Sequence, residues 1–315
     1  MKLTYILNRH SVLTGLAAMG CFLIFLTSAR AAQEENFPTP DEAVKAFTAA
    51  ASNKDTNALE VIFGPGLREI VSADAVQASN SLVHLSGRVS EKVNKVQVSD
   101  SFIGLELGAD AWPFPIALIK QDGKWHFDTD GGKEEILNRR IGRNELNTIR
   151  VCHAYVEAQR EYAGADHTGS GVLEYAQHLR STTGKHDGLY WHAEPGEEIS
   201  PLGPLVAEAH VEGYSHESKI LTDKQVPYQG YYFKILTRQD SHAPCGKYDY
   251  FINGHMIAGF ALVAWPAEWG NSGVMTFIIN QQGKVYEKNL GPKTSEIAAK
   301  MTTYDPGPGW KPAKE

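Results

Sequence analysis

The sequence lacks the short motifs by which hydrolytic and metal-dependent enzymes are most easily recognised. It contains no HExxH pair of histidines, no GxSxG turn around a serine nucleophile, and no pair of cysteines at the spacing of a metal site. Cysteine is scarce altogether, with 3 in 315 residues. No catalytic residue is therefore predicted, and the sequence favours a protein that is not an enzyme while leaving that question open.

Basic residues are outnumbered by acidic ones. The chain has 30 Lys and Arg against 37 Asp and Glu, a net charge of −7. Loss of residues 1–31 would remove three basic residues and no acidic ones, leaving 27 basic and 37 acidic residues and a net charge near −10. This acidic balance argues against nucleic acid or an anionic membrane surface as a partner.

Residues 1–31 predict a secretory signal peptide. Lys2 and Arg9 make a basic start, residues 12–26 are mostly apolar, and Ala29–Ala31 fits the small-x-small pattern before a cleavage site. The apolar run is shorter than the roughly 20 residues that span a bilayer. We expect cleavage after Ala31, a periplasmic or secreted location, and no membrane span in the mature chain. Lipidation of Cys21 is not expected, since the usual Leu is missing before it.

The two remaining cysteines, Cys152 and Cys245, predict a disulfide in an oxidising compartment. Such a bond would tie a long helix to later strands. The alternative is two separate buried thiols, because sequence does not show the geometry that a disulfide needs.

The length and the 42% hydrophobic content predict two domains of α+β class. Residues 32–130 predict an N-terminal domain of helices followed by an antiparallel sheet. Thr39-Pro40-Asp41-Glu42 is a helix start with N-cap, Pro and capping Glu. Alternating runs then predict four strands, at 93–99, 102–107, 115–120 and 124–128. The layout resembles the nuclear-transport-factor-like cone folds.

Residues 131–144 predict a connecting helix, and residues 145–304 a C-terminal α+β domain. A long amphipathic helix, possible as one rod from Lys133 to Ala163, should be followed by a glycine turn and a second short helix. Strand-like runs follow from Tyr231 to Lys288, and the apolar run 257–265 predicts a central strand covered on both faces. A last helix at 294–301 precedes a Pro/Gly tail, 305–315, that we expect to be frayed.

Several stretches of the mature chain are similar to one family. They include RRIGRNEL (139–146), DGLYW (187–191), GFALVAWPAEWGNSGVMTFIIN (259–280) and GKVYEKNLGP (283–292). These stretches resemble the bacterial domain-of-unknown-function 2950 proteins. The resemblance implies a secreted or periplasmic bacterial protein with no assigned activity.

The C-terminal half also resembles the globular half of type IV pilins and pseudopilins. The resemblance rests on NELNTIRVCHAYVEAQREYA (144–163), on a glycine turn and a Tyr-containing helix after it, and on GYYFKIL (230–236) with the strands that follow. The resemblance implies a helix packed on an antiparallel meander. Here a whole domain precedes the helix, where pilins have a membrane-embedded segment.

An irregular stretch, 185–229, predicts a binding groove against the C-terminal sheet, because long connections with little regular structure are often functional. Exposed Tyr and Trp side chains would suit a protein or glycan partner in the cell envelope. Half or more of these aromatic residues are expected to be core instead. The candidate binding residues are Asp187, Tyr190, Trp191, Glu194, Tyr232, Trp265 and Trp269.

Two stretches are weighed as metal sites. Residues 166–171 have the rhythm of a calcium loop, but Gln177 stands where a bidentate Glu is needed, so a plain turn is favoured. A polar exposed loop is favoured over a metal site for the second set, which is His186, Asp187, His192, Glu194, Glu197 and Glu198, followed by His210, Glu212, His216 and Glu217. No metal and no cofactor is predicted.

Taken together, the residues favour an exported envelope protein that works as a non-enzymatic binding or assembly module. One alternative is a hydrolase of envelope material with Asp187 and Glu194 as its carboxylates. The other is a pseudopilin-like structural subunit.

Overall fold

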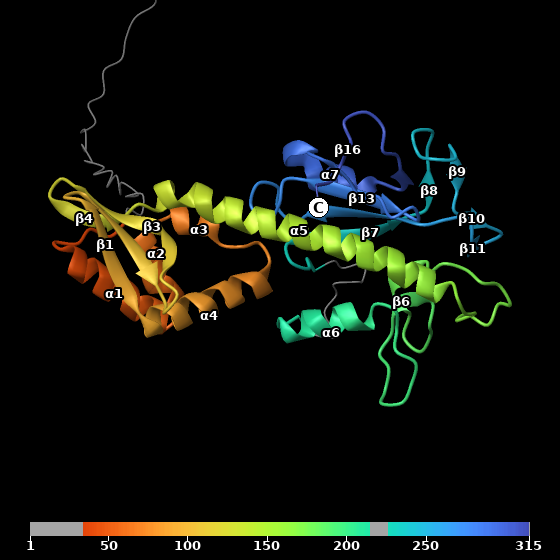
Figure 1. Cartoon of the computed structure of the whole chain (residues 1–315), viewed down its shortest axis with the longest axis horizontal. Coiled ribbons are helices and arrows are strands. Elements are labelled where there is room, and N and C mark those ends of the chain that lie inside the picture. Colours follow the sequence, from red (N-terminus) through yellow and green to blue (C-terminus); the bar gives the residue numbers. More distant parts are fainter. Residues whose placement is uncertain (1–33, 215–225, 315) are drawn as a thin grey trace, which may run out of the picture. The chain divides into compact units, whose positions relative to one another are not determined.

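The computed structural model describes residues 34–214 and 226–314. The predicted signal peptide, Cys21, His216 and Glu217 lie outside these residues. Within them, no helix is both long enough and apolar enough to cross a membrane. The fold is α+β, as predicted, with helices and several antiparallel sheets (Figure 1).

The N-terminal residues form helices followed by a four-stranded sheet. The Thr39 hydroxyl accepts the Glu42 N–H and starts the first helix, as the sequence predicts. The strands are antiparallel in the order β1-β2-β3-β4. The elements are α1 (Pro40–Ser52), α2 (Thr56–Phe63), α3 (Gly66–Ile70), α4 (Ala75–Glu91), β1 (Val93–Ser99), β2 (Phe102–Leu107), β3 (Trp112–Gln121) and β4 (Lys124–Phe127).

These helices and strands enclose one hydrophobic core. Three phenylalanines meet at its centre, with the Phe127 ring 5.4 Å from that of Phe47 and 5.1 Å from that of Phe63. All three are buried, and aromatic contacts of this kind add about 0.5–1.5 kcal/mol to the burial of their area. The residues from Phe37 to Phe127 thus have a core of their own.

Helix α5 (Thr129–Tyr162) is continuous over 34 residues and joins the predicted connecting helix to the predicted long helix. Near its start it packs on β3, where Gly132 approaches Ile116. Farther along it packs on the C-terminal sheet (Figure 1). There the Tyr155 hydroxyl donates to the Ala261 carbonyl over 3.2 Å. A second hydrophobic core, from Ile149 to Tyr304, forms around this part of the helix. Whether the two cores are separate domains stays a prediction.

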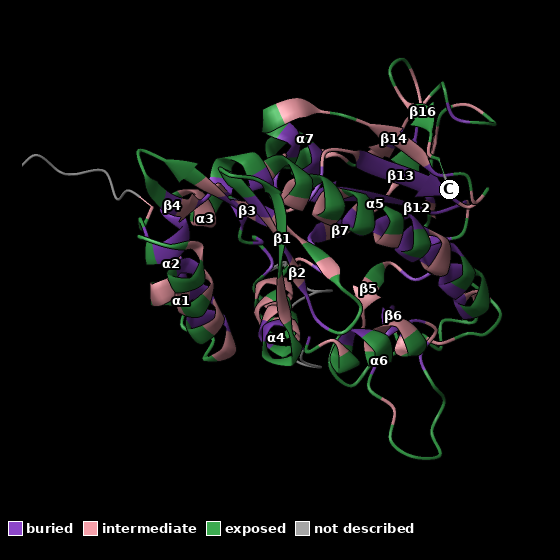
Figure 2. Cartoon of the chain, turned by 60° about the vertical axis from the view of Figure 1, so that its left-hand side comes forward, coloured by how far each residue is buried: buried purple, intermediate pink, exposed green. Residues whose placement is uncertain are grey.

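The C-terminal sheet has five antiparallel strands in the order β16-β14-β13-β12-β7. All 6 residues of β12 are buried, so both faces of this strand are covered, as predicted for the apolar run (Figure 2). Helix α7 packs on β12 as α5 does. The strands and helix are β7 (Tyr231–Leu236), β12 (Ala261–Pro266), β13 (Thr276–Asn280), β14 (Tyr286–Lys288), β16 (Lys311–Pro312) and α7 (Thr294–Lys300).

The expectation of a frayed tail is wrong for the described residues. β16 pairs with β14 through Lys311 and Pro312, and β15 (Thr303–Tyr304) pairs with β8 (Arg238–Gln239). Tyr304 is buried in the C-terminal core, which explains why the Pro/Gly-rich end is held.

The predicted second short helix after α5 is also absent. The residues around Tyr175 are not helical, and the next element is β5 (His178–Arg180), paired with β6 (Gly188–Tyr190). The Tyr175 ring packs 4.7 Å from that of the buried Phe260, so this stretch contacts the C-terminal core without forming a helix. The remaining elements are α6 (Gly203–Val211), β9 (Tyr248–Asp249), β10 (Phe251–Ile252) and β11 (His255–Met256).

The predicted disulfide is not present. Cys152 and Cys245 are both free, the first fully buried in α5 and the second exposed in a turn where its φ is +69°. Cys152 packs inside the core around α5, whereas Cys245 faces solvent, so the two side chains lie in different surroundings. Burial raises the pKa of Cys152 to about 12. The even number of cysteines suggested a pair that the fold does not form.

Candidate functional site

The predicted aromatic binding residues lie mostly in the core. Tyr190, Trp191 and Trp265 are buried, as the alternative core interpretation expects. The half-buried Tyr232 packs its ring 5.7 Å from that of Trp265. Trp269 is 37% exposed, and its indole N–H donates to Asn289 over 3.0 Å. Their faces are therefore largely used in packing.

The two predicted carboxylates have different surroundings. Asp187 accepts the Thr182 N–H over 2.7 Å and closes its own loop. Partial burial alone would raise the pKa of Asp187, but the Thr182 hydrogen bonds together with His178 and Lys185 hold it below its usual range. Glu194 is exposed, and one of its oxygens lies 3.5 Å from Nε2 of His192.

The stretch weighed as a calcium loop is a turn built on Asp166. Its carboxylate accepts the N–H groups of Gly171 over 2.7 Å, Ser170 over 3.2 Å and Gly169 over 2.8 Å. These hydrogen bonds, that of Gly171 foremost, hold the pKa of Asp166 below its usual range. Because both oxygens already receive N–H donors, this carboxylate serves the turn that positions His167.

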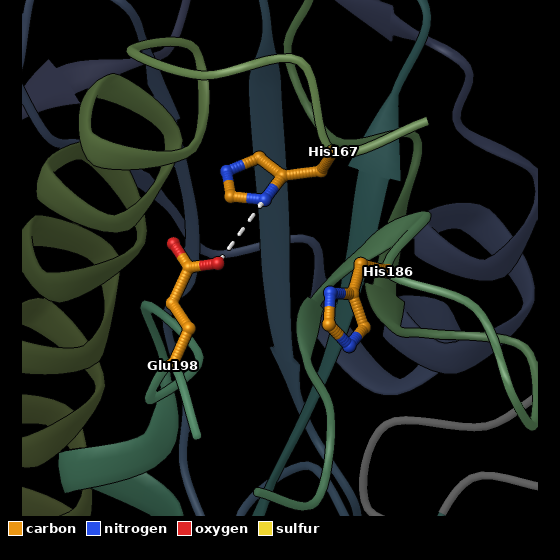
Figure 3. Close-up of side chains that lie close together, drawn as sticks. All are labelled: His167, His186 and Glu198. Atoms are coloured by element: carbon orange, nitrogen blue, oxygen red, sulfur yellow. Dashed lines mark ion pairs between the residues drawn. The ribbon is translucent and has the colours of Figure 1, made fainter. Parts of the chain in front are cut away.

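The structure brings together three potential metal ligands, His167, His186 and Glu198. One ring nitrogen of each histidine and one carboxylate oxygen all lie within 4.8 Å of one another (Figure 3). Nδ1 of His167 is 4.0 Å from Oε2 of Glu198. The side chain of His167 is only 6% exposed, whereas His186 and Glu198 are exposed. All three lie on the loop face, which we define as residues 163–200 between α5 and α6.

Two buried aromatic residues position these groups. Tyr162, the last residue of α5, stacks its ring 4.5 Å from that of His167 and donates its hydroxyl to the His186 carbonyl over 2.7 Å. Trp191 lies 4.2 Å from the His186 ring at an interplanar angle of 13°, and its indole N–H donates to the Glu198 carbonyl over 3.0 Å. Each of the three segments is thus fixed to the same aromatic pair.

Only part of this cluster is predicted from the sequence. His186 and Glu198 belong to the polar set weighed as a metal site, whereas His167 lies in the separate stretch weighed as a calcium loop. The three residues are far apart along the loop, so no short spacing marks them. The sequence offers one indication of the site, Trp191, because a ring of this size has to be buried even where the neighbouring residues are polar.

A polar hollow of about 510 Å³ lies beside the β3–β4 turn. His126 and Glu34 face each other there, with Nε2 3.8 Å from Oε2. Burial raises the pKa of Glu34, and His126 opposes the rise. The lining residues are Glu34, Asn36, Gln121, Asp122, Lys124 and His126.

Comparison with known protein families identifies a match over most of the chain. The model of a family described as "Protein of unknown function (DUF2950)" matches residues 34–313. No curated protein and no solved structure matches the chain.

Proposed function

The chain belongs to the DUF2950 family, and on that premise we propose that it is an exported bacterial envelope protein that acts by binding a protein partner through its loop face. One observation supports the proposal most directly: buried rings pack beneath the loop face, and exposed side chains converge on it. Trp191 and Tyr190 are buried under it, and His186 and Glu198 stand exposed above them.

The surroundings of the Asp187 and Glu194 carboxylates favour a binding role over hydrolysis. A glycosidase needs two carboxyl groups placed on either side of a substrate, one of them protonated. The Asp187 carboxylate is a hydrogen-bond acceptor inside its own loop. The Glu194 side chain is exposed beside His192.

A protein partner is favoured over a glycan by the burial of the rings. Sugars bind on exposed aromatic faces, and Tyr190, Trp191 and Trp265 do not offer theirs. The loop face instead exposes two aliphatic side chains, Leu173 at 60% and Ile199 at 68%. Apolar side chains among exposed polar ones are typical of a protein interface.

Photo-cross-linking in living cells tests this proposal. A photoreactive amino acid at Ile199 should give an adduct with a defined envelope protein, identified by mass spectrometry. The same amino acid at Val61, which is 59% exposed on α2, is the matched control. The adduct should survive Asp187→Asn and Glu194→Gln. Equal labelling from both positions would mean that the loop face has no specific partner. Turnover of wall material that is abolished by these two changes would instead show that the protein is a hydrolase.

Export is proposed from the N-terminal sequence, with its basic start, apolar run and Ala29-Arg30-Ala31. Mass spectrometry of the protein from an envelope fraction should find an N-terminal peptide that begins at Ala32. A peptide that retains residues 1–31, or a lipid on Cys21, would show a tethered protein instead.

A pseudopilin-like subunit is the second candidate, favoured by the packing of α5 on an antiparallel sheet. That role requires self-association. Sedimentation of the purified protein across a range of concentrations distinguishes the two, since a binding module stays a single species while a filament subunit forms larger assemblies.

A further inference from the structure

We propose that His167, His186 and Glu198 bind one divalent transition-metal ion of the zinc class. The inference names a ligand of the loop face and rests on the proposed function only in assigning binding to that surface. Two imidazole nitrogens and one carboxylate oxygen gather within 4.8 Å. This is a ligand set that zinc uses when three protein ligands leave a fourth position open.

The distances allow a metal ion to close the site. A tetrahedral zinc ion with bonds of about 2.0–2.2 Å holds its ligand atoms roughly 3.3 Å apart. Atoms within 4.8 Å of one another must therefore approach by no more than roughly 1.5 Å. The exposed Glu198 can make most of this adjustment by side-chain rotation, and the His186 ring can make a smaller one across the face of Trp191.

The remaining ligand, His167, is held in place by its neighbours. His167 is 6% exposed, and its ring lies between those of Tyr162 at 4.5 Å and Trp191 at 5.4 Å. Tyr162 and Trp191 also hydrogen-bond the carbonyls of His186 and Glu198. One fixed imidazole with two adjustable ligands, all anchored to one buried aromatic pair, is more organised than a chance group of surface side chains.

The donor types select the class of ion. Imidazole nitrogen suits Zn²⁺, Cu²⁺ and Ni²⁺, whereas Mg²⁺ and Ca²⁺ take oxygen ligands. A simple ion pair would explain the 4.0 Å between His167 and Glu198 but gives no role to His186. The exposed side of the site leaves the fourth position open to water or to a carboxylate of the bound partner.

Zinc titration of the full-length protein, purified without a histidine tag and stripped with a chelator, tests the inference. Competition with a fluorescent zinc indicator should show one ion bound per chain, and Co²⁺ should give the visible absorption bands of a four-coordinate site. His186→Gln and Glu198→Gln are the decisive variants because both residues are exposed. His186→Gln also removes a ring that stacks on Trp191, so circular dichroism should show that this variant keeps its fold. Each should weaken zinc binding at least about tenfold.

The matched control is the double variant His192→Gln, Glu194→Gln, which removes an exposed His–Glu pair from the same loop face. It should bind zinc as the unaltered protein does. The inference is overturned if zinc fails to bind at one ion per chain, if either decisive variant binds normally, or if the control loses binding equally. Cross-linking from Ile199 is repeated in the presence of a chelator to separate the two proposals. A partner adduct that persists without metal supports the binding role whatever the result of the zinc titration.

Discussion

The Tyr214 hydroxyl donates to the Asp74 carboxylate over 2.6 Å and joins residues 140 positions apart. Asp74 is 1% exposed and is the N-cap of α4, where it accepts the N–H groups of Val76 and Gln77. The same carboxylate accepts the Gly230 N–H over 3.0 Å. One buried negative charge therefore holds a helix start in the N-terminal core to two segments of the C-terminal core.

Tyr214→Phe should destabilise the fold by about 1.5–3 kcal/mol, because it removes a donor from a buried charge while keeping the ring. Urea unfolding followed by circular dichroism measures the loss. A double-mutant cycle with Asp74→Asn separates the hydrogen bond from other effects of the change. If the two losses simply add, the hydroxyl and the carboxylate are not coupled and this assignment is wrong.

Helix α5 offers a second test, with two glycines ten positions apart. A methyl group on Gly132 would meet Ile116 Cγ1 and the Pro115 carbonyl, each at 2.8 Å, whereas Gly142 has nothing within 4 Å. Gly142→Ala should raise the free energy of unfolding by about 0.5–1 kcal/mol through helix propensity. Gly132→Ala should lower it by about 1–3 kcal/mol through overpacking. Thermal or urea unfolding of both variants decides, and equal effects would mean that α5 does not press on β3.

The elements with strong local signals were predicted correctly from the sequence. Alternation placed β1 and β2 at their observed bounds, and the capping residues placed the start of α1. β3 was predicted too short, as 115–120, because proline is unusual in a central strand. Its pairing with β2 shifts register between Ile103 and Leu105, and this bulge accommodates Pro115.

Elements and contacts that depend on distant residues were not predictable in this way. The loop face has no periodic pattern, and its course is set by the Tyr162 hydroxyl on the His186 carbonyl and the Trp191 indole on the Glu198 carbonyl. The approach of His167 to Glu198 follows from the Trp191 hydrogen bond and from the contacts of the His167 ring with Tyr162 and Trp191. The cysteines show the reverse case. Two cysteines in the mature chain suggest one disulfide, but their side chains lie in different surroundings.

Glu287 gives a prediction about pH. Burial first, and repulsion by Glu145 second, raise its pKa, while Lys314 and Lys311 oppose the rise. Because the pKa of Glu287 is higher in the folded protein than in the unfolded chain, its contribution to stability is fully present at pH values below the unfolded-state pKa. This contribution is lost as the pH rises through the folded-state pKa. Gln imitates the neutral form, so Glu287→Gln should be more stable than the unaltered protein at pH 7, by less than about 1 kcal/mol.

That gain should disappear as the pH falls below the normal pKa of glutamate, where the unaltered side chain is itself neutral. Urea unfolding at pH 7 and near pH 3.5 measures both conditions. Glu296→Gln, on the exposed side of α7, shows the general effect of removing a surface carboxylate. A larger gain for Glu287→Gln at the lower pH would reverse the sign and refute the assignment.

The free cysteines give the last prediction. Alkylation requires the thiolate, and Cys152 is fully buried with its pKa raised to about 12, whereas Cys245 is exposed. In the folded protein at pH 8, iodoacetamide should modify the peptide that contains Cys245 and leave the one that contains Cys152 untouched. Unfolding in urea without a reductant should then make Cys152 reactive at once, because only burial protected it. If both peptides stayed unmodified in urea until a reductant was added, the two thiols would be joined in a disulfide after all, and the packing of α5 around Cys152 would have to differ from the arrangement described.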